Sequence, residues 1–196
     1  MKELDKLFEF KPSGIKATRG RVLISEPLLG DFFFKRAVLL LAEHNDDGAF
    51  GLILNKKTDY KIYDLVEELE GFEADVFIGG PVETDNIFFL HTRNDLISGS
   101  EEIIDGVFWG GNFAEVKSSI LSGTIEEDEI RFFLGYSGWS PNQLDEELKQ
   151  YSWLVSKITP KSIFTKSPDE LWKGLVVNFG EKFKTWLNIP INPQLN

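Results

Sequence analysis

The chain contains two histidines, His44 and His91, and an imidazole is well suited to act as a general base near neutral pH. A serine hydroxyl beside it would complete a hydrolase-like site, for which Ser25 and Ser137 are the candidate nucleophiles. The sequence alone places no Ser, His and Asp together. A hydrogen-bonded histidine in a turn or at the end of a strand is therefore the simpler interpretation of each.

Ser137 lies in residues 135–139, which read Gly-Tyr-Ser-Gly-Trp. The nucleophile elbow of serine hydrolases requires Gly-x-Ser-x-Gly, and a tryptophan occupies its last position here. Two further glycine-rich stretches are residues 79–82 (GGPV) and 110–112 (GGN). Neither matches a phosphate-binding glycine pattern, and we interpret both as turns that require a positive φ.

No metal ion or cofactor is predicted. The absence of cysteine excludes disulfides, thiolate metal sites and cysteine nucleophiles. Neither histidine stands in a His-x-x-x-His pattern. Acidic residues gather at positions 67–68, 126–129 and 145–147, and we interpret each cluster as a solvated helix face or loop.

The net charge of the chain indicates which classes of partner it can bind. The chain has 21 Lys and Arg against 32 Asp and Glu, a net charge of −11, which disfavours direct contact with the phosphates of nucleic acid. The longest aliphatic run, residues 37–42, is far shorter than the roughly 20 residues of a membrane span. Residues 1–10 are amphipathic, unlike a signal peptide. We expect a cytoplasmic protein that contacts neither nucleic acid nor membrane.

The aromatic residues suggest a binding region. Trp139 and Trp153 flank a short expected helix and lie near Tyr136, Gln143 and Glu147 in the sequence. Tyrosine and tryptophan with a few polar groups often line a cleft that holds a small ligand or a peptide. The alternative is that the two tryptophans clamp this helix onto the sheet.

Apolar runs bounded by turn residues predict a series of short strands. An Asp-Gly turn at 47–48, between two of these runs, predicts a hairpin. The near-continuous apolar character of the runs predicts sheet faces that are covered by helices or by another sheet. The expected strands are 21–25, 36–43, 49–55, 75–79, 86–91, 103–109, 130–134 and 162–164.

Four helices are expected from apolar spacing and capping residues. One follows Asp59 as far as residue 69, and a second follows Asn112. Ser140 and Ser167 each open a capping box with proline at the first helical position, which predicts the other two helices.

A single domain is expected, because the 196 residues contain neither a Pro/Gly/Ser-rich linker nor an internal repeat. Strands and helices do not alternate strictly, which favours an α+β fold with a mixed, mostly antiparallel sheet flanked by helices. We expect residues 1–19 to form an N-terminal extension and residues 188–196 a tail.

The chain resembles the YqgE/AlgH family of bacterial proteins. Six blocks in the family's order carry the resemblance and make it specific. The departures are small: Ala37 stands where the family often has Ser, and Lys57 where it often has Pro. The blocks are 22–27 with Asp31 and 34–38; 41–44; 51–56; 79–82 with 89–91; 134–144; and Glu147 with 153–154.

The resemblance implies an α+β fold and supplies no catalytic residues, because the family has no established enzymatic activity. Some members are described as transcriptional regulators on genetic grounds. A redox role suggested for cysteine-bearing relatives cannot operate here. The candidate ligand- or partner-binding residues are Ser25, Asp31, Arg36, Glu43, His44, Asn55, Gly80, His91, Tyr136, Trp139, Gln143, Glu147 and Trp153.

Two hypotheses follow. In the first, the protein is a non-enzymatic regulator that binds a small ligand or a protein partner and acts without direct DNA contact. In the second, it is a hydrolase-like enzyme with a histidine base and a serine nucleophile. No oligomeric state is predicted.

Overall fold

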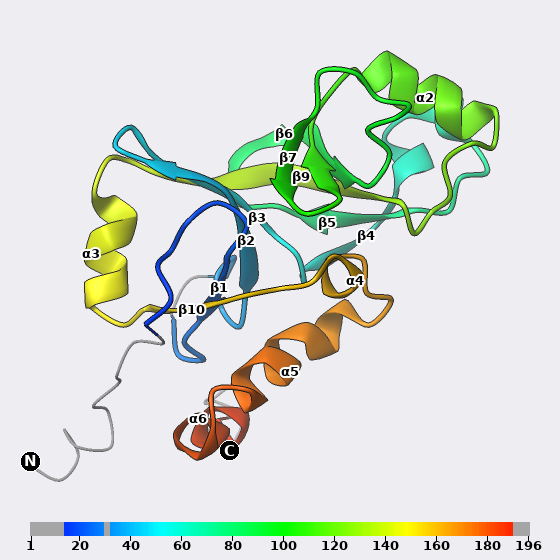
Figure 1. The fold of residues 1–196 in the computed structure, drawn as a ribbon. Helices are drawn as coiled ribbons and strands as arrows, with labels where there is room; N and C mark the ends of the chain where they lie inside the picture. The colour runs from blue at the N-terminus through cyan, green and yellow to red at the C-terminus, as the bar shows by residue number, and fades with distance from the viewer. Residues whose placement is uncertain (1–13, 30–31, 190–196) are drawn as a thin grey trace, which may run out of the picture.

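The computed structural model describes residues 14–29 and 32–189, which form one large sheet flanked by short helices (Figure 1). The strands are β1 (Val22–Ser25), β2 (Val38–Asn45), β3 (Gly48–Ile53), β4 (Lys57–Lys61), β5 (Asp75–Ile78), β6 (Val82–His91), β7 (Glu101–Ile104), β8 (Val107–Trp109), β9 (Ile130–Trp139) and β10 (Trp153–Ser156). The helices are α2 (Phe113–Leu121), α3 (Gln143–Lys149), α4 (Pro160–Ile163), α5 (Leu171–Val177) and α6 (Glu181–Leu187). Short 3₁₀ turns are η1 (Ile62–Asp64), η2 (Glu67–Leu69) and η3 (Pro168–Glu170).

Strand β9 joins the two halves of the sheet. The strand order is β10-β1-β2-β3-β9-β6-β8-β7, and β4 and β5 extend the sheet from β9 on a separate branch. The C-terminal part of β9 pairs with β3, whereas its N-terminal part pairs with β5 and β6. Among the pairings described, only that of β5 with β9 is parallel. The prediction of an α+β fold with a mixed, mostly antiparallel sheet is confirmed.

Both faces of the sheet are covered, which explains the apolar strands. In β1, Val22 and Ile24 pack into the central core, whereas Leu23 between them packs on the opposite face. Helices α5 and α6 supply Trp172 and Trp186 to the central core, and α3 covers the other face (Figure 1). A third cluster lies beneath α2. Alternate side chains of one strand thus enter different cores, so the strand has no polar face.

Several predicted elements are wrong. The helix expected over 59–69 is two 3₁₀ turns that follow a strand. Residues 162–164 belong to α4 and its end, not to a strand, because Thr159 caps a helical turn that begins at Pro160. The strand expected at 103–109 is a hairpin, since a turn at residues 105–106 separates β7 from β8. Strands β4 and β10 were not predicted from the sequence.

The two serine capping boxes form only in part. At the start of α3, the Gln143 side chain accepts a hydrogen bond from the Ser140 N–H at 3.0 Å, which is one half of the predicted box. Ser167 makes no side-chain cap, and its helix begins with the 3₁₀ turn η3. By contrast, Asn112 accepts the Ala114 N–H at 3.0 Å and caps α2 as expected.

Glycine allows β9 to pass very close to the connection between β5 and β6. A Cβ on Gly79 would lie 2.1 Å from the Gly135 carbonyl oxygen, and one on Gly80 would lie 2.3 Å from the Tyr136 carbonyl. The Gly79 carbonyl accepts hydrogen bonds from the Ile53 N–H and the Ser137 hydroxyl, so it links β3 to β9. At Gly79 the close approach, rather than the predicted positive φ, requires glycine.

A pair of glycine substitutions tests this packing. We expect Gly79→Ala to lower the free energy of unfolding by about 3 kcal/mol, because the new methyl group meets a backbone oxygen. Gly174→Ala is the control: this helical glycine has nothing within 4 Å of an added Cβ, so the change should raise stability by about 0.5–1 kcal/mol. Urea denaturation measures both. Equal effects of the two substitutions would contradict the close approach.

Candidate functional site

The structure distributes the predicted site residues among several places. Ser25, Arg36 and Asn55 lie together where β1 meets β2. Gln143, Glu147, Trp139 and Trp153 gather at α3. Glu43, Tyr136 and Trp139 line a groove. Gly80 lies against the Tyr136 backbone, and His44 lies near Asp145 of α3. His91 belongs to none of these groups, and Asp31 lies outside the described residues.

Ser25 and Asn55 hold the backbone at the start of β2. The Ser25 hydroxyl oxygen accepts the Ala37 N–H at 2.8 Å. The Asn55 side chain accepts the Val38 N–H at 2.7 Å and donates to the Arg36 carbonyl at 2.9 Å. These bonds fix the chain around Arg36, which has a positive φ of 53°. The polar groups are therefore engaged in holding the fold.

The Arg36 guanidinium lies over the Trp172 ring, 4.9 Å from its centroid, and donates a hydrogen bond to the Ile189 carbonyl. Burial lowers the pKa of Arg36. The Trp172 indole in turn donates to the Ser25 carbonyl at 3.0 Å. This group therefore connects the start of β2 to the C-terminal helices.

The Glu147 carboxylate binds both predicted tryptophans. Its Oε2 accepts the Trp139 indole N–H at 3.0 Å and the Trp153 indole N–H at 2.7 Å. Its Oε1 accepts the Gln143 amide at 3.2 Å. Both indoles are buried, and the Phe34 ring packs against each of them. This arrangement attaches α3 to the sheet, as the clamp interpretation of the tryptophans requires.

His91 is buried and uses both ring nitrogens. Nε2 lies 3.2 Å from the Gly110 carbonyl oxygen and Nδ1 lies 3.2 Å from the Arg93 N–H, so the partners assign Nε2 as the donor and Nδ1 as the acceptor. Burial lowers the pKa of His91, opposed by its bond to Gly110. The Phe108 ring stacks on the imidazole. These bonds hold the neutral imidazole as part of the fold.

His44 lies between a backbone carbonyl and a carboxylate. Its Nδ1 lies 2.8 Å from the Ala17 carbonyl oxygen, and its Nε2 lies 3.7 Å from an Asp145 carboxylate oxygen. Ser137, one of the two candidate nucleophiles, is buried within β9, and its hydroxyl donates a hydrogen bond to the Gly79 carbonyl. Within residues 14–29 and 32–189, neither imidazole has a serine or threonine hydroxyl as a hydrogen-bond partner.

A groove of about 730 Å³ opens over the junction of β3, β6, β8 and β9. Four half-buried aromatic side chains from these strands, Phe50, Phe88, Trp109 and Tyr136, line it and contact one another. The Phe88 and Trp109 rings are stacked, with centroids 6.0 Å apart. Sequence analysis selected only Tyr136 among the four, because the others lie on separate strands.

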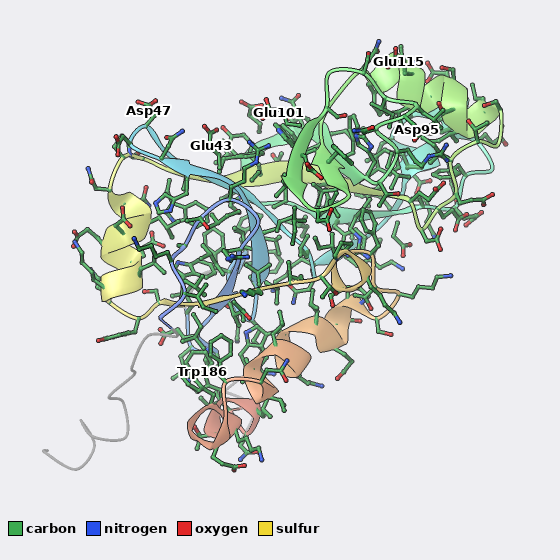
Figure 2. All side chains as sticks on the ribbon, viewed as in Figure 1. Glu43, Asp47, Asp95, Glu101, Glu115 and Trp186 are labelled. Carbon is green, nitrogen blue, oxygen red and sulfur yellow. The ribbon has the colours of Figure 1, made fainter. Side chains whose placement is uncertain are left out.

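The rim of this groove is acidic. Glu43, Asp47 and Glu83 line it and are exposed. Figure 2 shows Glu43 and Asp47 at the same end of the molecule, along the β2–β3 hairpin. Each glutamate accepts one amide hydrogen bond, Glu43 from Asn45 and Glu83 from Asn86. The groove thus combines an aromatic floor with a negatively charged edge.

A second hollow, of about 750 Å³, contains a residue that sequence analysis missed. Arg131 lines it and is only 7% exposed, although it lies in an apolar strand. Its guanidinium donates to the Leu54 carbonyl at 3.1 Å and the Thr165 carbonyl at 2.7 Å. Burial lowers the pKa of Arg131 to about 10, with nearby Asp75 opposing the shift. The available signal was a single charge inside the run Ile-Arg-Phe-Phe-Leu at 130–134.

Comparison with known proteins places the chain in a family. The sequence profile described as AlgH-like matches residues 22–184, which run from β1 into α6. The protein belongs to the AlgH-like family. A UPF0301 protein of Cytophaga hutchinsonii is 46% identical over 91% of this chain and 99% of its own length. A UPF0301 protein of Chlorobium limicola is 40% identical over 92% of this chain and 97% of its own.

Solved structures share the fold of this AlgH-like protein. The solution structure of the AlgH protein of Pseudomonas aeruginosa has a TM-score of 0.71 and 27% identity, covering 92% of this chain and 98% of its own. A crystal structure of a Corynebacterium diphtheriae protein has a TM-score of 0.76 at 17% identity, covering 92% and 96%. The resemblance to the YqgE/AlgH family is confirmed, and it is a family of unknown function.

In the part of the chain that the structure describes, every helix is too short or too polar to cross a lipid bilayer. Over the same residues, His, Asp and Glu side chains form no group of three arranged to hold a metal ion.

Glu147 provides a test of the indole clamp. We expect Glu147→Ala to lower the free energy of unfolding by about 2–3 kcal/mol, because two buried indole N–H groups lose their acceptor. Glu146→Ala is the matched control, since Glu146 is exposed and, among the described residues, forms its ion pair with Lys149, and we expect it to change stability by less than about 0.5 kcal/mol. Urea denaturation followed by tryptophan fluorescence measures both, and equal losses would contradict the clamp.

The buried His91 predicts a pH dependence of stability. Its pKa is lowered in the folded state, so the unfolded state takes up a proton first as the pH falls below about 6.5. The contribution of the neutral imidazole is therefore present at about pH 7.5 and is lost as the pH falls toward the folded-state pKa. Urea denaturation at about pH 7.5 and at a pH below about 6.5 measures the loss of unfolding free energy on acidification. This loss should be smaller in His91→Gln than in the unsubstituted protein. An unchanged pH effect would exclude His91 as its source.

Proposed function

We propose that the protein is a non-enzymatic binding protein, whose groove over Phe50, Phe88, Trp109 and Tyr136 receives a lysine- or arginine-bearing segment of a partner protein. The observation that carries this proposal is the combination of four clustered aromatic rings with an acidic rim. Any regulatory role is then exercised through a protein, without direct contact with DNA.

The floor of the groove suits a cationic side chain. The Phe50 ring centroid lies 4.7 Å from that of Trp109 and 5.0 Å from that of Tyr136, so the rings form a continuous surface. A guanidinium or ammonium group over the face of Trp or Tyr is attracted by the negative potential of the ring. The aliphatic stem of lysine or arginine also packs favourably on aromatic carbon.

The charge around the groove favours the same occupant. Glu43, Asp47 and Glu83 surround it, and the described residues that line it include no lysine or arginine. The chain as a whole carries a net charge of −11, which adds long-range attraction for a basic segment and repels nucleic acid. A groove bounded by several strands and open at its rim has room for a peptide segment.

The described contacts of the two histidines and the two candidate serines do not support a histidine–serine pair. Both histidines hydrogen-bond to backbone atoms, and Ser25 and Ser137 are buried and bound to the backbone. No observation therefore favours the hydrolase hypothesis over binding.

Titration with end-blocked peptides tests the proposal. We expect Gly-Arg-Gly-Arg-Gly to bind saturably in isothermal titration calorimetry, with an affinity that falls as salt rises, because exposed charges are screened. Gly-Glu-Gly-Glu-Gly should not bind. Trp109→Ala and Glu43→Gln should each weaken binding about tenfold, by removing a ring face and a rim charge.

Glu146→Gln supplies the control, because it removes one exposed negative charge away from the groove. Equal weakening by Glu146→Gln and Glu43→Gln would show that the peptide responds to net charge alone and would overturn the groove as the site. The absence of saturable binding would also overturn it.

A further inference from the structure

We infer that the hollow beside Arg131 binds a small zwitterion, a molecule whose carboxylate pairs with the Arg131 guanidinium and whose ammonium group pairs with acidic residues that also line the hollow. This site is separate from the groove and goes beyond the proposed function. Three observations carry it: an unpaired buried cation, a cavity of suitable size, and lining residues of both charges.

Arg131 is a buried cation that lacks a carboxylate partner. Its two hydrogen bonds go to the Leu54 and Thr165 carbonyls, and its guanidinium also lies 4.3 Å from the centroid of the Phe77 ring. Three of its five N–H groups have no acceptor among the residues that the structure describes. A buried charge without a counterion is costly, and the planar guanidinium matches a carboxylate through two parallel hydrogen bonds.

The neighbouring Asp75 does not fill this role. Lys57 Nζ lies 2.8 Å from Asp75 Oδ2, and Lys61 Nζ lies 2.8 Å from Asp75 Oδ1. Both carboxylate oxygens thus pair with lysines of β4, and these two ammonium groups help to keep the pKa of Asp75 low against the effect of burial. Asp75 acts on Arg131 only through space.

The hollow is lined by residues of both charges. Arg131 donates to the Thr165 carbonyl, and the next residue, Lys166, also lines the hollow and adds a second positive charge. The acidic lining residues include Glu73, whose N–H donates to the Glu127 carboxylate at 3.1 Å, and the adjoining Glu126 and Asp128. Lys61 also lines the hollow, but it pairs with Asp75 and Glu73. An anion would pair only with the basic residues and a cation only with the acidic ones, whereas a zwitterion pairs with both.

The size of the hollow sets the class of ligand. Its volume of about 750 Å³ lies in the range of small-molecule sites, roughly 300–1,000 Å³. An amino acid or a short peptide with free ends fits this volume and carries the two required charges. Phe72, Phe164 and Ile125 supply apolar surface among the charged lining residues.

Titration with alanine and trialanine tests the inference. We expect one or both to bind saturably and to shift the Arg131 Nε–Hε resonance in ¹⁵N NMR spectra, identified by its absence in Arg131→Lys. N-acetyl-trialanine and trialanine amide each lack one charge and should bind about tenfold more weakly than trialanine if the peptide is the ligand. If alanine binds and trialanine does not, N-acetylalanine and alanine amide are the end-blocked ligands to compare, and each should bind about tenfold more weakly than alanine.

Two surface variants keep the test independent of the fold. Lys166→Gln and Glu126→Gln change exposed lining residues of opposite charge, and each should weaken binding at least threefold. Glu43→Gln, in the groove, should leave it unchanged, so failure of one site is distinguished from failure of the other. Absence of saturable binding by both alanine and trialanine, or equal binding of the end-blocked forms, would overturn the inference.

Discussion

The passage of β9 against the β5–β6 connection is the constraint on which the rest of the structure depends. Gly79, Gly80 and Gly135 have no side chains, and this lets two backbones approach more closely than any Cβ would allow. The same contact allows β9 to pair with β5 and β6 at one end and with β3 at the other. One strand thereby holds both halves of the sheet, and both proposed binding sites include its residues.

Around this strand, most polar groups that stand out in the sequence serve the architecture. Glu147 receives two indole N–H groups, Asn55 bridges two backbone sites, and His91 uses both ring nitrogens within the fold. A family motif can therefore report structural requirements as readily as a binding site. The surfaces that remain for binding are formed by other residues: aromatic rings beneath an acidic rim in the groove, and Arg131 in the hollow.

Local sequence signals account for much of the fold. Apolar runs bounded by turns located β1, β2 and β3, and Asn112 located the start of α2. The misses arise where local signals compete: the apolar pair Ile163 and Phe164 suggested a strand, but the Thr159 cap and Pro160 set a helical turn. The short apolar run of β10, Trp153–Ser156, pairs with β1, and the strand prediction left it out.

The candidate sites were less predictable because they are made by tertiary pairing. Phe50, Phe88 and Trp109 come from three strands and meet only when β9 has brought those strands together. Arg131 gave a local signal, because it is a charged residue in an apolar run. The sequence does not show, however, that the neighbouring Asp75 pairs with Lys57 and Lys61 and so leaves Arg131 without a carboxylate partner. Tyr136 was a candidate as part of an aromatic region and Glu43 through the family resemblance, yet only the three-dimensional arrangement defines the groove that they share.

The pairing of β1 with β10 has a consequence for biosynthesis. Val22 lies opposite Ser156, so β1 leaves the ribosome about 130 residues before its outer neighbour in the sheet is made. Until then, the free N–H and C=O groups along the outer side of β1 form an open sheet edge, which favours pairing with other chains. A nascent or truncated chain that ends before Trp153 therefore carries a built-in tendency to aggregate, which the arrival of β10 removes.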